Sequence, residues 1–382
     1  MLERVALSPQ ARPATATIWL AERGAIIGWW AGSRILVLGA AFSLHWLRAP
    51  RGYFGRHIFD HVLGPLEAWD GVWYRRVAEH GYLLVPGHQS DPAFFPLYPM
   101  LLKASSAVGI STTAAGVVLS NALFLGALLA FDALGHELFP SVLARRATLL
   151  LAIFPTSYVC SMVYPESFVL LTFSLVGLFA VRRKWLACAL FAALAGLARP
   201  EGALLLLPIG AAAVAQRRTL APDESGRALA AVLSAPAAAL SFPLYLGWAL
   251  HDPLAWSKAQ QAWGRSFRLD GLFVAIAHVG RKIADNGWTA RDVAFCVLTL
   301  LLLSAAWRAD APRGWIALGV VIVLLPLGSG SFASDARFAL LALPAYWGLA
   351  WLCRDRRVFA LAAAVSACLL VAATVTLPLV FP

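Results

Sequence analysis

Charged residues are scarce in this chain of 382 residues, because only 13% are Asp, Glu, Lys or Arg while 60% are hydrophobic. A soluble domain of this length could not bury so much apolar surface, so the composition excludes an ordinary soluble fold. Acidic residues are scarcer than basic ones, with 20 Asp and Glu against 31 Lys and Arg. The basic excess lies in short arginine clusters between apolar runs, which is typical of cytoplasmic loops and not of nucleic-acid binding.

Cysteine is also rare, and several common catalytic signatures are missing. The five cysteines lie in or at the ends of apolar segments without a CxxC pair, which predicts buried free thiols and neither a disulfide framework nor a zinc site. The chain has no GxxxxGK[ST], HExxH, GxSxG or DxD pattern. A nucleotide-sugar donor is therefore not supported, and no cofactor or metal site is expected, although a need for a divalent metal stays open.

What the chain has instead is a series of apolar runs, and runs of about 20 residues predict transmembrane helices. We expect one transmembrane domain over residues 1–382, an all-α bundle of about eleven spans without internal repeats. The first span is 24–47, which lacks a cleavage site after a short hydrophobic region and is expected to remain uncleaved. The later spans are expected at 113–134, 147–163, 168–181, 185–198, 203–215, 228–250, 291–307, 315–328, 336–353 and 358–382.

Short basic joints recur at alternate connections, and the positive-inside rule orients them toward the cytoplasm. These joints are Arg145-Arg146, 182–184, 217–218, Arg308 with Arg313, and 354–357. Two long polar intervals, 48–93 and 251–290, then form extracytoplasmic loops. This orientation requires 94–107, which contains Pro96, Pro99 and Lys103, to be a partial or re-entrant helix.

The first extracytoplasmic loop contains the stretch Trp69-Asp70-Gly71-Val72-Trp73-Tyr74. Aromatic rings favour the membrane interface and also stack on sugars or lipid chains. A carboxylate at this depth can accept a proton from an incoming hydroxyl group. An interfacial helix anchored by Trp residues and capped by Asp explains the stretch equally well.

Further carboxylates and basic side chains fall on the same predicted face. They are Glu166, Arg199, Glu201, Asp252, Lys258, Arg265 and Arg337. Taken singly, each is an ordinary loop residue. As a set near a lipid boundary, they suit a site that deprotonates a hydroxyl group and holds an anionic lipid phosphate.

Several stretches spread over the chain recur in one known family. They are the 69–74 stretch, Gly81-Tyr82, Phe94-Phe95-Pro96-Leu97-Tyr98-Pro99, Phe154-Pro155-Thr156-Ser157, Tyr164-Pro165-Glu166-Ser167, Arg199-Pro200-Glu201-Gly202, Asp252-Pro253-Leu254-Ala255-Trp256 with Gln260, Trp263, Gly264 and Arg265, and Ser334 through Arg337-Phe338. From about residue 65 to 345, the chain thereby resembles the PIG-V-like mannosyltransferases of the GT-C class of membrane glycosyltransferases.

The resemblance implies a GT-C-type bundle whose long first extracytoplasmic loop carries short interfacial helices. It implies an inverting transfer of a mannosyl or related hexosyl group from a polyprenyl-phosphate sugar to a hydroxyl of a lipid or glycan acceptor. Asp70 matches the position of the family's presumed base. The Ala- and Arg-rich composition suggests a GC-rich bacterium, with the protein in the cell membrane and an acceptor other than a GPI anchor.

The candidate substrate-binding residues beside Asp70 are Trp69, Trp73, Tyr74, Tyr98, Glu166, Arg199, Glu201, Arg265 and Arg337. The three arginines are candidates for the donor phosphate, with Arg337 first because it opens a predicted span at the outer boundary. The two glutamates orient sugar hydroxyls or pair with the arginines. The aromatic residues line a sugar or lipid groove or anchor the chain at the interface.

A multi-span transporter or lipid flippase is the alternative function, and a non-catalytic membrane partner is a third. Transporters commonly show repeated halves with paired broken helices. This chain shows one long loop after the first span and polar residues on a single predicted face, which favours the transferase.

Overall fold

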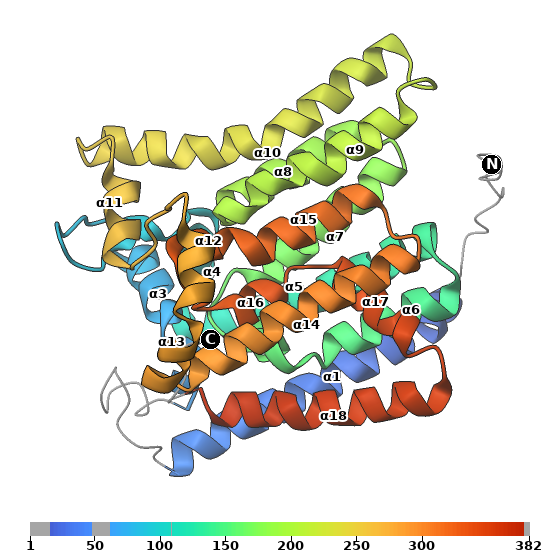
Figure 1. Ribbon diagram of the computed structural model, residues 1–382, viewed down its shortest axis with the longest axis horizontal. Helices are drawn as coiled ribbons and strands as arrows, with labels where there is room; N and C mark the ends of the chain where they lie inside the picture. Colours follow the sequence, from blue (N-terminus) through green and yellow to red (C-terminus); the bar gives the residue numbers. More distant parts are fainter. Residues whose placement is uncertain (1–15, 48–61, 108, 378–382) are drawn as a thin grey trace.

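The computed structural model describes residues 16–47, 62–107 and 109–377, and the regular elements of these residues are all helices (Figure 1). The first group is α1 (Ala16–Leu47), α2 (Gly64–Glu67), α3 (Asp70–His80), η2 (Asp91–Ala93) and α4 (Leu97–Ser106). The central group is α5 (Thr112–Leu138), α6 (Ser141–Ala152), η3 (Pro155–Ser161), α7 (Glu166–Val181), α8 (Trp185–Ala198), η4 (Pro200–Leu205), α9 (Leu206–Gln216) and α10 (Pro222–Ala249). The last group is α11 (Ala255–Ala262), α12 (Gly271–Ala277), α13 (Val279–Asp285), α14 (Trp288–Arg308), α15 (Arg313–Leu324), η5 (Leu325–Ser329), α16 (Asp335–Ala339), α17 (Pro344–Leu352) and α18 (Arg356–Val375).

Five helices of the described residues are long and apolar enough to cross a membrane, or six if one bent pair counts as a span. The five lie in α1, α5, α10, α14 and α18, at positions where spans were expected. The predicted count of about eleven is not confirmed. The other expected spans are helices of at most 16 residues, several interrupted by 3₁₀ turns that begin at or beside a proline.

The helices run back and forth, so that their connections gather at two ends (Figure 1). One end holds α3, α11 and α13, which belong to the two long polar intervals expected as loops. Residues 48–61 of the first interval lie outside the described part of the chain. The opposite end holds the basic joints α9–α10, α14–α15 and α17–α18. The helix α4, at 10 residues, is too short to cross a hydrocarbon layer about 30 Å thick.

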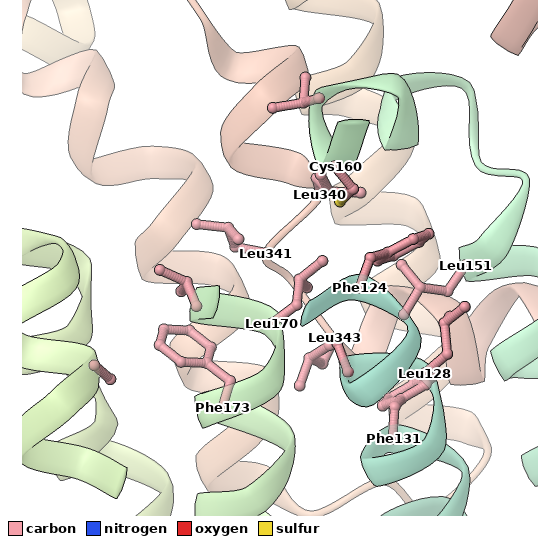
Figure 2. Close-up of a cluster of buried hydrophobic side chains, with 14 of the residues drawn as sticks. Phe124, Leu128, Phe131, Leu151, Cys160, Leu170, Phe173, Leu340, Leu341 and Leu343 are labelled. Atoms are coloured by element: carbon pink, nitrogen blue, oxygen red, sulfur yellow. The ribbon is translucent and has the colours of Figure 1, made fainter. Parts of the chain in front are cut away.

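The hydrophobic core lies where α5 and α7 meet the segment that joins α16 to α17 (Figure 2). Its large side chains include Phe124, Leu128, Phe131, Leu170, Phe173, Leu340, Leu341 and Leu343. Close helix contacts elsewhere depend on small residues. A side chain at Gly196 of α8 would lie 2.3 Å from the carbonyl oxygen of Ala235 in α10, so only glycine permits this approach.

The expected span 147–163 is bent, because α6 and η3 meet at 68°. Pro155 opens η3 and cannot donate a backbone hydrogen bond, so carbonyl oxygens around the break need other donors. Arg34 of α1, only 3% exposed, donates from its guanidinium group to the carbonyl oxygens of Ser157 (2.9 Å) and Ala152 (3.3 Å). It also reaches the hydroxyl of Ser161 at 3.0 Å. A buried arginine thus stabilises the break that precedes α7.

The five cysteines are free thiols, and four are buried. Cys368 is exposed on α18, which corrects the prediction that all five are buried. The reason is its position on the outward face of a helix at the edge of the bundle, where apolar residues such as Leu361 and Leu369 are exposed as well.

Replacing Arg34 by methionine should destabilise the protein without changing its helix content. Each buried polar group left without a partner costs about 1–3 kcal/mol, and several carbonyl and hydroxyl oxygens would lose their donor. We expect a lower thermal midpoint in detergent for Arg34→Met than for wild type. The matched control is Arg357→Met at an exposed position. Equal midpoints for the two variants would contradict the role of Arg34.

Candidate functional site

A cavity of about 480 Å³ opens where α3, η4, α11 and α16 approach one another. Its polar lining residues are Asp70, Tyr74, Arg199, Glu201, Gln260, Arg265 and Arg337. Its apolar lining includes Phe94, Phe95, Leu204, Trp256, Trp263, Leu325 and Phe338. The cavity therefore combines a charged group of side chains with an aromatic and aliphatic wall.

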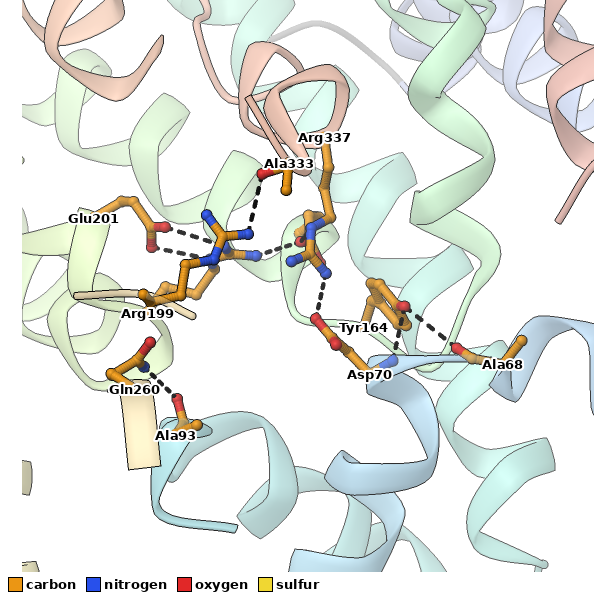
Figure 3. A network of polar contacts seen from close by, with 11 residues as sticks. Ala68, Asp70, Ala93, Tyr164, Arg199, Glu201, Gln260, Ala333 and Arg337 are labelled. Carbon is orange, nitrogen blue, oxygen red and sulfur yellow. Dashed lines mark hydrogen bonds and ion pairs between the residues drawn. The ribbon is translucent and has the colours of Figure 1, made fainter. Parts of the chain in front are cut away.

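The central contact is an ion pair between two buried residues that lie 267 positions apart (Figure 3). Nη1 of Arg337 donates to Oδ2 of Asp70 over 2.5 Å. Asp70 is 7% exposed and Arg337 5% exposed. Removing one partner of such a pair leaves an uncompensated buried charge, so each residue depends strongly on the other.

The charge pair continues into a chain of alternating acids and bases. Nε of Arg337 lies 3.6 Å from Oε1 of Glu166, and Arg199 donates to the same oxygen. Arg199 also forms two parallel hydrogen bonds of 3.0 Å to the carboxylate of Glu201. Asp70, Glu166 and Glu201 supply three negative charges, and two guanidinium groups oppose them. The bidentate geometry fixes the plane of Arg199.

Arg265, from the connection between α11 and α12, adds a third guanidinium group beside the cavity. It donates to the carbonyl oxygen of Ala333 at 3.0 Å and lies 5.4 Å from the ring centre of Phe338. No carboxylate of the described residues forms an ion pair with it. Desolvation lowers the pKa of Arg265, and the positive charge of Arg337 acts in the same direction. An anion in the cavity would relieve both effects.

Asp70 follows a strained turn, because Trp69 has a φ of 63° although it is not glycine. The hydroxyl of Tyr164 bridges this turn. It accepts a hydrogen bond from the backbone N–H of Asp70 (3.0 Å) and donates to the carbonyl oxygen of Ala68 (3.2 Å). The indole N–H of Trp69 donates to the carbonyl oxygen of Leu377 at 2.8 Å. These bonds set the position from which Asp70 faces the cavity.

Of the four aromatic residues predicted to bind substrate, only Tyr74 lines this cavity. Tyr98 is 1% exposed, and its hydroxyl pairs with that of Ser120 at 2.8 Å. Trp73 is stacked behind Phe94, with ring centres 5.8 Å apart. The indole of Trp69 is held by its hydrogen bond to the carbonyl oxygen of Leu377. Trp69 and Trp73 are half-buried and Tyr98 is buried, so these three residues pack beside the cavity and do not line it.

Of the charged residues predicted to bind substrate, some line the cavity and one does not. Glu166 is fully buried and does not line the cavity, so its place is the ion pair and not a contact with a sugar hydroxyl. Arg199, Glu201, Arg265 and Arg337 do line it. The charge of Arg337 already opposes Asp70 and Glu166, whereas Arg265 forms no ion pair with a carboxylate of the described residues.

Further residues near the cavity were not among the predicted site residues. Trp256, Gln260 and Trp263 line it from α11 and the residue after it, and they lie within the stretches of family resemblance. Gln260 donates to the carbonyl oxygen of Ala93 at 3.2 Å, which joins α11 to the first loop (Figure 3). Tyr164 also lies in such a stretch, but no sequence signal shows which backbone groups its hydroxyl reaches.

A second pair of carboxylates, Asp292 and Asp335, lies behind Arg337. Asp292 accepts hydrogen bonds from the backbone N–H groups of Ser334 and Ala336. Asp335 is 0% exposed, and neither of its oxygens has a hydrogen-bond partner in the described structure. Burial, reinforced by Asp292, raises the pKa of Asp335 to about 8. Within the residues that the structure describes, no three His, Cys, Asp or Glu side chains are grouped to hold a metal ion.

These features define an all-helical protein with membrane-length helices and a buried site of alternating carboxylates and arginines. The predicted resemblance to the PIG-V-like mannosyltransferases is confirmed, because residues 40–215 match the family described as Mannosyltransferase (PIG-V). This match contains Asp70, Glu166, Arg199 and Glu201, whereas Arg265 and Arg337 lie beyond it.

Curated relatives agree with this family match. GPI alpha-1,6-mannosyltransferase 2 of Homo sapiens is 32% identical over 157 residues, which cover 38% of this chain and 31% of the relative. The protein of the same name from Mus musculus is 34% identical over 152 residues, covering 36% of this chain and 30% of the relative. The alignment thus spans about a third of the length of the curated relatives.

Solved structures are similar to a lower degree. A crystal structure of the Archaeoglobus fulgidus oligosaccharyltransferase tethered with an acceptor peptide gives a TM-score of 0.46 at 10% identity, covering 94% of this chain and 56% of that chain. A second crystal structure of that oligosaccharyltransferase, with zinc and sulfate, gives 0.42 at 12% identity, covering 81% and 49%. A similarity of this degree does not determine the function of the chain.

Replacing Asp335 by asparagine should remove a dependence of stability on pH. A carboxyl group whose native pKa is raised from 3.8 to about 8 binds more protons when folded, so wild-type stability falls as the pH rises toward about 8 and then levels. We expect the midpoint of Asp335→Asn to exceed that of wild type by a margin that grows between pH 5 and about 8. The exposed Asp285→Asn is the control. A margin independent of pH would contradict the raised pKa.

Proposed function

We propose that this protein is an inverting membrane glycosyltransferase of the GT-C class. In this proposal it moves a mannosyl or related hexosyl group from a polyprenyl-phosphate sugar to a hydroxyl of a lipid or glycan acceptor. The family match supports the sugar-transfer chemistry.

The observation that carries the proposal is the carboxylate of Asp70 at the wall of a cavity that also presents guanidinium groups. An inverting transfer needs a base beside the acceptor hydroxyl and positive charge beside the leaving phosphate. Both kinds of group line the same cavity of about 480 Å³. Among the described residues, two carboxylates line the cavity, Asp70 and Glu201. Both oxygens of Glu201 already accept hydrogen bonds from Arg199, which leaves Asp70 as the candidate base.

The proposed reaction is a single displacement. The acceptor oxygen attacks the anomeric carbon while the bond from that carbon to the phosphate oxygen breaks. The acceptor proton passes to Asp70, and the polyprenyl phosphate leaves with the bonding electron pair. Arg265 and Arg337 stabilise the charge that develops on the phosphate. Tyr74, Arg199 and Glu201 are the proposed contacts of the sugar.

The ion pair between Asp70 and Arg337 suits an ordered binding of the two substrates. While Arg337 contacts Asp70, it occupies one oxygen of the proposed base. A donor phosphate near Arg265 would compete for Arg337 and leave Asp70 free to accept a proton. We therefore propose that the lipid-linked donor binds before the acceptor.

The aromatic wall supports a donor that carries a lipid. Phe94, Phe95, Trp256 and Trp263 give the cavity apolar surface next to its charged groups. The proposed location is the extracytoplasmic side of a cell membrane, because the basic joints gather at the end of the helices opposite α3 and α11 (Figure 1). A transporter would need its polar site between two repeated halves near the membrane midplane. Here α3 and α11, at the end that holds the two long polar intervals, form one wall of the cavity, which favours the transferase.

Substitution of Asp70 by asparagine should abolish most transfer, because an amide cannot take up the acceptor proton. Loss of a general base lowers the rate about 100-fold to 10,000-fold. The assay incubates membranes with labelled polyprenyl-phosphate mannose and measures labelled product per amount of protein. Asp252→Asn is the control, since Asp252 pairs with Lys258 and does not line the cavity. Near-normal transfer by Asp70→Asn at normal protein levels would exclude Asp70 as the base.

Substitution of Arg265 by glutamine should weaken use of the phosphate donor. A hydrogen bond to a charged group contributes about 1.5–3 kcal/mol, so kcat/KM for the donor should fall about 10-fold to 100-fold. Arg268→Gln is the control, because Arg268 pairs with the exposed Asp270 and does not line the cavity. An equal effect of both substitutions would count against a phosphate site at Arg265.

A further inference from the structure

Both members of the central ion pair are preceded by a strained turn. Trp69 before Asp70 has a φ of 63°, and Ser334, three residues before Arg337, has a φ of 68°. Residues other than glycine adopt this left-handed region at a cost, and such strain persists only where surrounding contacts stabilise it. Tyr164 stabilises the first turn, as described above. The contacts of the second turn come from Asp292.

Ser334 is the residue before α16, where serine commonly caps a helix with its own hydroxyl. In this turn the side chain makes no capping bond, and its buried hydroxyl oxygen has no hydrogen-bond partner among the described residues. The carboxylate of Asp292 supplies the acceptors instead. Its Oδ2 accepts from the N–H of Ser334 at 3.1 Å, and its Oδ1 accepts from the N–H of Ala336 at 3.3 Å. A side chain of α14 therefore caps α16.

The position of α16 determines where Arg337 points. The helix has five residues, and Arg337 is the third of them. The backbone N–H of Arg337 donates to the carbonyl oxygen of Ser334 at 2.9 Å. The strained turn, the first turn of the helix and the guanidinium group that reaches Asp70 are thus consecutive parts of one short segment.

Asp292 itself is well fixed and lies outside the cavity. It is 6% exposed, belongs to the first turns of α14, and accepts a 3.0 Å bond from Nη2 of Arg291. It does not line the cavity around Asp70. Asp292 therefore acts on that cavity indirectly, through the backbone of α16 that it caps and through its charge beside Asp335.

We propose that Asp292 is a positioning residue, which holds Ser334 in its left-handed conformation and thereby sets the contact between Arg337 and Asp70. The expected effect on transfer kinetics depends on the proposed transferase function. The positioning of Arg337 by Asp292 does not depend on that function. An amide at position 292 would lose the charge and one of the two acceptor oxygens, so the strained turn could relax and move Arg337.

The test uses the relief of strain by glycine, which adopts positive φ freely. Asp292→Asn should lower kcat/KM for the lipid-phosphate donor about tenfold or more, because Arg337 no longer meets the donor phosphate correctly. Adding Ser334→Gly should reduce the loss caused by Asp292→Asn to about threefold or less, measured against Ser334→Gly alone. Asp292→Glu, which keeps the charge, should retain more transfer than Asp292→Asn.

The matched control is Asp132→Asn, which removes a buried carboxylate paired with Arg145 at the opposite end of the helices. If this control lowers transfer as much as Asp292→Asn, or if Ser334→Gly brings no recovery, Asp292 has only a general structural role and the proposal is overturned.

A second readout separates this proposal from the proposed function. Thermal midpoints of wild type, Asp292→Asn, Arg337→Met and the double variant are measured in detergent. If Asp292 acts through α16, the two substitutions are not additive, because each disrupts the same contact. Additive shifts would overturn the positioning role even in an active protein. Absence of sugar transfer by wild type, with non-additive shifts, would refute the function and leave the positioning role supported.

Discussion

The buried contact between Asp70 and Arg337 is the constraint on which the rest of the site depends. Two opposite charges out of water stabilise each other only if their geometry is good and their remaining hydrogen-bonding groups are satisfied. Glu166, Arg199 and Glu201 extend the pair into a network that compensates each charge by a neighbour. The segments that carry these charges, which are α3, α7, η4 with the preceding Arg199, and α16, therefore share one electrostatic requirement, and a shift of any one of them would leave an unmatched charge.

The longest helices follow from physical rules that can be read from sequence, but the breaks in the shorter ones do not. Long apolar runs predict α1, α5, α10, α14 and α18, because a membrane-length helix needs only continuous hydrophobicity. The bend before Pro155 was missed, since its unpaired carbonyl groups are satisfied by Arg34, more than a hundred residues earlier. The local sequence around Pro155 does not show that a residue so far away in the chain supplies these hydrogen bonds.

Some features of the site could likewise be predicted from sequence, and others could not. Asp70 could be proposed from its neighbours and its family resemblance, and the structure brings it beside Arg337, Arg199 and Glu201. The surroundings of the aromatic residues could not be predicted in the same way, because a Tyr or Trp in such a stretch can equally face a cavity or the core. Only tertiary packing decides that Tyr98 turns toward Ser120 while Tyr74 meets the cavity. Tyr164 and Asp292 act through backbone groups of distant segments, which residue types alone cannot reveal.

The separation of 267 positions between Asp70 and Arg337 has a consequence for biogenesis. A ribosome releases Asp70 long before it has made the guanidinium group that compensates it. During that interval the carboxylate must stay hydrated at the membrane surface or find a temporary cation. The cavity can therefore form only after the later helices have inserted. Its assembly is a late event that requires nearly the whole polypeptide to have inserted correctly.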